Sequence, residues 1–173
     1  ADGQCFRVDM RLRPYGDSGP LAMSAPAMEL YFLEQGREWE RYALIKARVV
    51  AGDAVQGQAL IETLAPFVYR KYLDYGALES LRSMKAMIAR EVRRRRLADN
   101  VKLGRGGIRE VEFIAQAFQL IRGGQEPGLR QRGLQPVLAY LAEQALIPAH
   151  AQHELTEAYR YLRRIENRIQ AMH

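Results

Sequence analysis

The sequence predicts a mainly α-helical protein with one or two β-strands at its N-terminal end. In most segments after residue 24, apolar residues recur every three or four positions, which is typical of amphipathic helices. Only residues 6–13 alternate strictly between apolar and charged side chains, as a strand with one buried face does. Glycine and proline separate these segments. We therefore expect six or seven helices against one or two strands.

The predicted strand over residues 6–13 would bury its four apolar side chains. Its other face would carry Arg7, Asp9, Arg11 and Arg13. One carboxylate among three guanidinium groups suits a site that holds a metal ion and phosphate groups. A solvated face, with ion pairs that each contribute less than ~1 kcal/mol, produces the same pattern. The strand alone leaves both interpretations open.

Residues 14–20 are rich in turn formers and would end this strand, and residues 21–24 could form a short returning strand. A strand at the very start of a chain needs neighbours to pair with, and few strand candidates follow. The sequence also lacks an initiator methionine. We therefore expect a piece of a longer protein, with part of its sheet preceding residue 1.

Helices are expected through the rest of the chain. Ser24 is a typical N-cap for the first helix, which Gly36 ends. Gly52-Asp53 separates the next two helices, and Pro66 opens a short segment after them. Gly123-Gly124 ends a helix in the second half. The helices after the first are expected at 39–50, 53–64, 77–96, 108–122, 134–145 and 150–172.

Four consecutive arginines at 93–96 end the longest helix of the first hundred residues. Positive charge is favourable at a helix C-terminus, so a solvated helix end explains the run. No aromatic residues alternate with these arginines, so base stacking is not indicated. We therefore predict no nucleic-acid partner.

The glycine-rich loop at 104–107 precedes a helix and offers backbone N–H groups at the positive end of its dipole. Lys102 and Arg109 add positive charge beside it, so the loop could bind an anion. A simple connection between helices is the alternative interpretation. Glu110 and Glu112 follow, but they point about 200° apart on a regular helix and cannot face one ligand. One of them could bind a metal or pair with an arginine while the other stabilises the structure.

The charge balance indicates an anionic partner. The chain has 26 lysines and arginines against 20 acidic residues, a formal net charge of +6. Cys5 is the single cysteine, which excludes an internal disulfide and agrees with a reducing compartment. No apolar run approaches the ~20 residues of a membrane span. We expect a soluble, cytoplasmic protein with no membrane partner.

Three long motifs resemble the bacterial glutamine synthetase adenylyltransferase family. They are RVDMRLRPYGDSGPL at 7–21, QGREWERYALIKAR at 35–48, and KLG at 102–104 with GGIREVEF at 106–113. The segment 162–170 continues the similarity, which therefore runs through nearly the whole chain. The enzymes of this family are bifunctional. The residue sequences of the second and third motifs resemble those in the N-terminal, adenylyl-removing half.

This resemblance implies a fold and a site. The fold is a helical bundle domain preceded by a remnant of a polymerase-β-like nucleotidyltransferase sheet, with residues 1–50 ending the nucleotidyltransferase domain and 51–173 forming the helical domain. Asp9 matches the third carboxylate of the family's catalytic and metal site. The paired acids of that site should lie upstream and are absent here. The isolated chain is therefore expected to be inactive.

The resemblance also implies phosphorolysis, in which phosphate attacks the AMP–tyrosine linkage of glutamine synthetase and releases ADP. Mg²⁺ is the implied cofactor, because it prefers hard oxygen ligands. The implied partners are glutamine synthetase, the PII signalling protein, ADP or ATP, and phosphate. A helical regulatory module that contacts glutamine synthetase or PII is the alternative function. From charge and position, the expected phosphate- or nucleotide-binding residues are Arg7, Arg11, Arg13, Lys46, Arg48, Lys102 and Arg109.

Overall fold

The computed structural model describes residues 9–72 and 100–172, together with 76, 79, 82, 83, 85, 86, 90 and 94. These residues are mainly helical, as predicted, and no strand occurs among them. The elements are η1 (Gly16–Ser18), α1 (Ala25–Glu34), α2 (Glu38–Leu44), α3 (Ala54–Val68), α5 (Ile108–Arg122), η2 (Pro127–Leu129), α6 (Leu134–Glu143) and α7 (Ala149–Ala171). The division of the chain at residue 50 stays a prediction.

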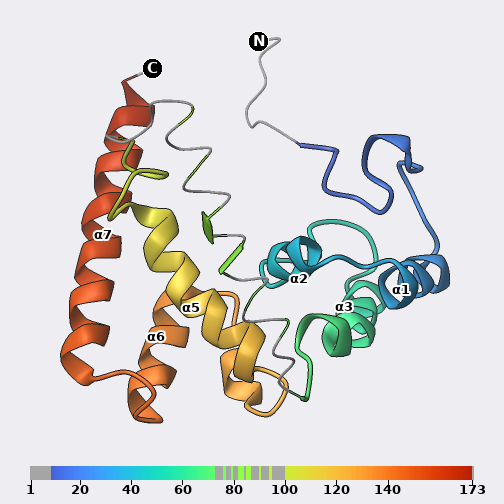
Figure 1. Cartoon of the computed structure of the whole chain (residues 1–173). Coiled ribbons are helices and arrows are strands. Elements are labelled where there is room, and N and C mark those ends of the chain that lie inside the picture. The colour runs from blue at the N-terminus through green and yellow to red at the C-terminus, as the bar shows by residue number, and fades with distance from the viewer. Residues whose placement is uncertain are drawn as a thin grey trace.

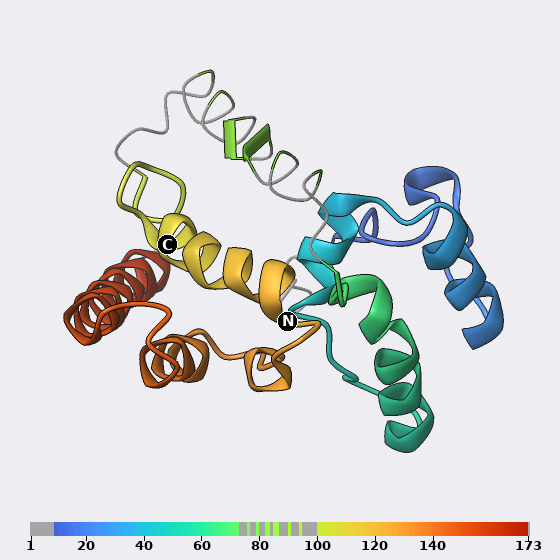
Figure 2. The ribbon, with the colours of Figure 1, turned by 60° about the horizontal axis from the view of Figure 1, so that its bottom comes forward.

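The helices form two groups that meet at α5. Figure 1 shows α5, α6 and α7 on one side of the molecule and α1, α2 and α3 on the other. The turned view in Figure 2 keeps the two groups apart, with α5 between them. Helix α5 contacts α2 on one side and α6 and α7 on the other, and α3 contacts both α1 and α2.

Buried apolar side chains explain this arrangement. The α5–α6 core consists of Val111, Ala115, Leu129, Leu134, Val137, Leu138 and Leu141. The α2–α3–α5 cluster consists of Ile45, Val68 and Leu120, and the α1–α3 cluster of Tyr31, Phe32 and Leu64. Because α5 contributes to the first two, it holds the two helix groups together.

The predicted helix starts are confirmed at two N-caps. The Ser24 hydroxyl accepts a hydrogen bond from the backbone N–H of Ala27. The Asp53 carboxylate accepts from the backbone N–H groups of Val55 and Gln56. Both side chains satisfy helix N–H groups that have no partner within the helix.

Two helix limits differ from the prediction. Pro66 lies inside α3, in its last turn. There it removes one backbone donor while Leu64 and Val68 stay buried, so the helix continues past it. Helix α2 ends at Leu44 and not at residue 50, because Lys46 N–H bonds to Ala43 and Ala47 N–H bonds to Leu44 in a tightened last turn.

The strand predicted over residues 6–13 is wrong in the part that the structure describes. Residues 10–15 form turns and bends, with Met10 52% and Leu12 66% exposed. The Asp9 carboxylate accepts a hydrogen bond from the backbone N–H of Arg11 at 3.0 Å, a local bond that competes with an extended ladder. Residues 6–8, including Arg7, lie outside the described residues.

The returning strand predicted over residues 21–24 is also not formed, and Leu21 is 74% exposed. An alternating or short apolar segment becomes a strand only where a partner strand covers it. Most of the helix predicted over 77–96 lies outside the described residues, as do three of the four arginines at 93–96.

None of the helices in the described part of the chain is long and apolar enough to cross a membrane. The cytoplasmic location stays a prediction.

Candidate functional site

Asp9 and Arg11 form an exposed ion pair in the N-terminal loop. The carboxylate oxygen Oδ2 of Asp9 lies 2.8 Å from Nη2 of Arg11, and their side chains are 38% and 66% exposed. This hydrogen bond raises the pKa of Arg11 above its ordinary value. Arg13 donates instead to the backbone carbonyls of Met10, Asp17 and Gly19. The side chains of Asp9 and Arg11 therefore contact each other, whereas Arg13 stabilises the loop through its backbone carbonyls.

Asp9 could supply one ligand of a magnesium site. Asp9 offers a hard carboxylate oxygen pair, which suits Mg²⁺. Among the residues that the structure describes, no three His, Cys, Asp or Glu side chains converge as a metal cluster would require. Further carboxylates would have to come from elsewhere in the protein.

The three glycines of the loop at 104–107 use their backbone N–H groups within the chain. Gly106 N–H donates to the Glu110 carboxylate at 2.9 Å, and Gly107 N–H donates to the carbonyl of Gly104 at 3.0 Å. The N–H groups of Ile108 and Arg109 donate to loop carbonyls at 3.1 and 3.0 Å. The residues before α5 therefore supply carbonyls to its first N–H groups, so these amides are not available for an anion.

Glu112 lies in a half-buried charged network between α5 and α7. Its Oε1 accepts a hydrogen bond from Nη2 of Arg163 at 3.0 Å. Nη1 of Arg163 also donates to Glu166 at 2.6 Å, and Lys102 Nζ lies 3.7 Å from Glu166. Glu112 pairs with an arginine while Glu110 binds the backbone of the preceding loop, so the two carboxylates have different roles.

Arg163 is held in this network by the carboxylates of Glu112 and Glu166 and by an aromatic ring. Its Nε donates to the Tyr159 hydroxyl at 3.1 Å, and its guanidinium lies 5.2 Å from the centre of that ring. Burial lowers the pKa of Arg163, but the hydrogen bonds with Tyr159 and Glu166 outweigh it, so the pKa lies above its ordinary value. The sequence analysis did not select Arg163 and Glu166 as site residues. Their spacing of three residues on a helix could have indicated an ion pair between them.

Two side chains from the α2 end face the same network. The ammonium group of Lys46 donates to the carbonyl of Arg132 at 2.8 Å. Burial lowers its pKa, Glu112 opposes this effect, and Arg163 and Arg132 add to it. Burial also raises the pKa of Tyr42 to about 12, against the opposing charge of Arg109.

The structure thus divides the predicted cationic residues into groups. Lys102 lies beside Glu166, and the charges of Glu112 and Arg163 act on Lys46. The charge of Arg109 acts on Tyr42. Arg11 and Arg13 lie in the loop with Asp9. Arg48 lines a separate pocket.

The raised pKa of Tyr42 leads us to expect that the folded chain loses stability at alkaline pH. A phenol whose pKa is higher in the folded than in the unfolded state, where it is about 10, contributes stability below that pH and loses it as the pH rises toward 12. We expect Tyr42→Phe to match the unchanged chain near pH 7 and to lose stability less steeply between about pH 10 and 12.

Urea unfolding at a series of pH values measures this difference. Lys46 titrates in both proteins, so the comparison isolates Tyr42. Parallel alkaline slopes for the two proteins would show that the Tyr42 phenol ionises as easily in the folded as in the unfolded chain.

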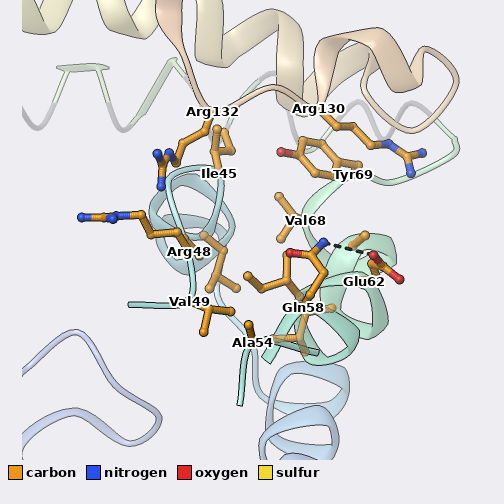
Figure 3. Close-up of a pocket in the computed structure, with 15 residues that line it drawn as sticks. Ile45, Arg48, Val49, Ala54, Gln58, Glu62, Val68, Tyr69, Arg130 and Arg132 are labelled. Carbon is orange, nitrogen blue, oxygen red and sulfur yellow. Dashed lines mark hydrogen bonds between the residues drawn. The ribbon is translucent and has the colours of Figure 1, made fainter. Parts of the chain in front are cut away.

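Arg48 belongs to a pocket between α3 and the segments that follow α2 and η2 (Figure 3). The pocket has a volume of about 670 Å³. Its walls are mostly apolar, and its charged members are Arg48, Glu62, Arg130 and Arg132. The sequence did not predict this pocket, because it brings residues 44–69 together with Arg130 and Arg132, more than sixty positions further along the chain.

Two family models match the chain. Residues 1–63 match glutamate-ammonia ligase adenylyltransferase, and residues 82–173, just over half of the chain, match GlnD PII-uridylyltransferase. Over 170 residues, 98% of its length, the chain is 63% identical to the bifunctional glutamine synthetase adenylyltransferase/adenylyl-removing enzyme of Nitrosococcus oceani. The chain belongs to the glutamine synthetase adenylyltransferase/adenylyl-removing enzyme family.

Other members of the family agree. The enzyme of the same description from Thioalkalivibrio sulfidiphilus is 61% identical over 170 residues, and that of Hahella chejuensis is 59% identical over 172 residues. The chain spans 18% of the length of each of these family members. Helices α5, α6 and α7, with the charged network, lie within the GlnD PII-uridylyltransferase match, whereas Asp9 and α2 lie within the adenylyltransferase match.

Proposed function

We propose that this chain is a segment of a nucleotidyltransferase that removes AMP from adenylylated glutamine synthetase by phosphorolysis. The segment belongs to the N-terminal, adenylyl-removing half. The observation that carries the proposal is the identity of 59–63% over nearly the whole chain to enzymes whose names give both activities. The partners are glutamine synthetase, inorganic phosphate, a nucleotide and the PII signalling protein.

Asp9 is the proposed catalytic residue and magnesium ligand. Its ion pair with Arg11 is exposed, and such surface pairs contribute less than ~1 kcal/mol, so exchanging this pair for a bound cation costs little. The other carboxylates of the site come from the rest of the protein. When bound, Mg²⁺ neutralises phosphate charge and aligns the reacting groups.

The cationic side chains hold the anionic reactants. In phosphorolysis, a phosphate oxygen bonds to the phosphorus of AMP, the phosphorus–tyrosine oxygen bond breaks, and the tyrosine oxygen takes up a proton. Arginine suits the phosphate oxygens because its guanidinium binds them in pairs. Arg11 and Arg13 are the proposed phosphate-binding residues beside Asp9. The proposed residues elsewhere are Arg7, which lies outside the described residues, and Lys46, Arg48, Lys102 and Arg109.

Asp9→Asn in the full-length protein tests this role. We expect deadenylylation to fall by roughly 10²-fold or more, because the charge that holds the reacting groups is lost. The exposed position of Asp9 means that folding should survive. ADP released from adenylylated glutamine synthetase and phosphate is the readout.

Asp17→Asn is the matched control, since Asp17 is an exposed aspartate of the same loop. Near-normal turnover of the Asp9→Asn protein would remove Asp9 from the site. We further expect the 173-residue chain alone to show no deadenylylation, since it supplies one carboxylate of the proposed site.

A regulatory, protein-binding role is the second candidate function. Tyr161 of α7 is 59% exposed and Met172, just after its end, is 82% exposed. Residues 82–173 match a PII-uridylyltransferase family model. Contact with glutamine synthetase or PII does not need the Asp9 carboxylate. The Asp9→Asn protein should therefore keep its partner binding if α7 carries that role.

A further inference from the structure

The pocket that contains Arg48 has an excess of positive charge on one side. Figure 3 shows Arg48 and Arg132 on the same side of the pocket, with Glu62 across from them. Glu62 already accepts a hydrogen bond from the Gln58 amide at 3.0 Å. Neither the Arg48 nor the Arg132 guanidinium has a hydrogen bond or ion pair within the described parts of the chain. Two cations without a counter-charge repel each other, so this side favours an anion.

The third arginine of the pocket is fixed in place. Arg130 donates from Nε to the carbonyl of Gly123 at 2.6 Å and from Nη2 to that of Gly124 at 3.2 Å. Its guanidinium also lies 5.4 Å from the centre of the Tyr69 ring. Because these contacts fix Arg130 and Tyr69 in place, the two residues form one wall of the pocket. Arg48 and Arg132 are then the arginines available to bind an anion.

The rest of the pocket is apolar. Ile45 and Val68 are 3% and 4% exposed and belong to the α2–α3–α5 cluster, and Val49 and Ile61 extend the apolar lining. The volume of about 670 Å³ lies within the roughly 300–1,000 Å³ of pockets that hold small molecules. An inorganic ion would leave most of this space and its apolar surface unfilled.

We propose that the pocket binds a small organic anion, with its carboxylate or phosphate group on Arg48 and Arg132 and its apolar body against Ile45 and Val68. Guanidinium groups bind both kinds of head group in pairs of hydrogen bonds. The buried apolar body adds binding free energy in proportion to the area it removes from water. The proposal does not depend on the metal site at Asp9, and Arg48 is the one residue that it shares with the proposed phosphate-binding residues.

The aromatic sulfonate 1-anilinonaphthalene-8-sulfonate is a suitable probe, because it joins an anion to an apolar body and fluoresces in apolar surroundings. We expect it to bind the 173-residue chain without Mg²⁺. Octanoate and octyl phosphate should displace it, and the stronger displacer identifies the preferred head group. Octylammonium, with the opposite charge, and acetate, without the apolar body, should displace it far less. Equal displacement by either of these would overturn the proposal.

The double variant Arg48→Gln/Arg132→Gln should bind the probe at least ~10-fold more weakly, because two charge-assisted contacts are lost. The double variant Arg164→Gln/Arg168→Gln is the matched control, since it removes the same charge from exposed positions of α7. Circular dichroism compares the folding of the two variants. Unchanged probe affinity in the first variant, or equal weakening in both, would contradict the assignment. Displacement from the unsubstituted chain tests the proposal independently of either variant.

Discussion

Arg41→Met should destabilise the chain by about 3 kcal/mol, since hydrogen bonds to charged groups contribute ~1.5–3 kcal/mol each. Arg41 is 1% exposed although it carries a full charge. Its guanidinium donates to the carbonyl of Val68 at 3.0 and 3.2 Å, reaches that of Leu120 at 3.5 Å, and pairs with Glu38 at 2.5 Å. It thus joins α2 to the ends of α3 and α5. Methionine fills the space but donates to none of these acceptors.

Urea unfolding of the Arg41→Met chain measures the loss. Arg160→Met is the matched control, because Arg160 also pairs with a glutamate three residues before it, at 3.0 Å, but is 55% exposed. Exposed pairs of this kind contribute under ~1 kcal/mol. If the free energy of unfolding fell equally in the two variants, the hydrogen bonds from Arg41 to the buried carbonyls would not stabilise the chain.

Leu138→Ala is expected to cost about 2–5 kcal/mol, the range for removing a fully buried leucine side chain. Leu138 is 0% exposed and lies within the α5–α6 core, so the substitution leaves a cavity among close-packed neighbours. A loss of 3 kcal/mol would lower the melting temperature by roughly 6–12 °C in a chain of this length.

Leu33→Ala provides the comparison, since Leu33 lies in a helix of the same length as that of Leu138 but is 80% exposed. Its free energy of unfolding should change by no more than about 0.5 kcal/mol. If both leucine variants melted at the same temperature, Leu138 could not be part of a packed core.

The helices could be predicted from the sequence because their signals are local. The apolar spacing of residues 108–122 and the caps Ser24 and Asp53 need only neighbouring residues, and α5, α1 and α3 formed where these signals lie. The strand could not be predicted in the same way. Alternation at 6–13 indicates a strand only if other strands cover it, and in the described part the Asp9 side chain bonds to its own loop instead.

The candidate site was predictable in parts. Charge and motif resemblance selected Lys46, Arg48 and Lys102, and the geometry of a helix separated Glu110 from Glu112. Arg41 was not expected in the interior, because a charged side chain on a helix normally faces solvent. Tertiary folding places Arg48 and Arg132 in one pocket, and it also forms the bond between Lys46 and the Arg132 carbonyl, which joins residues 86 positions apart.

The shared position of α5 bears on how the chain loses its structure. Val111 and Ala115 belong to the α5–α6 core, and Leu120 belongs to the α2–α3–α5 cluster. Neither the α1–α3 group nor the α6–α7 pair can separate from α5 without exposing apolar surface of that helix. We expect α1–α3 and α5–α7 to melt in one cooperative transition, with the slowest amide exchange along the shared helix.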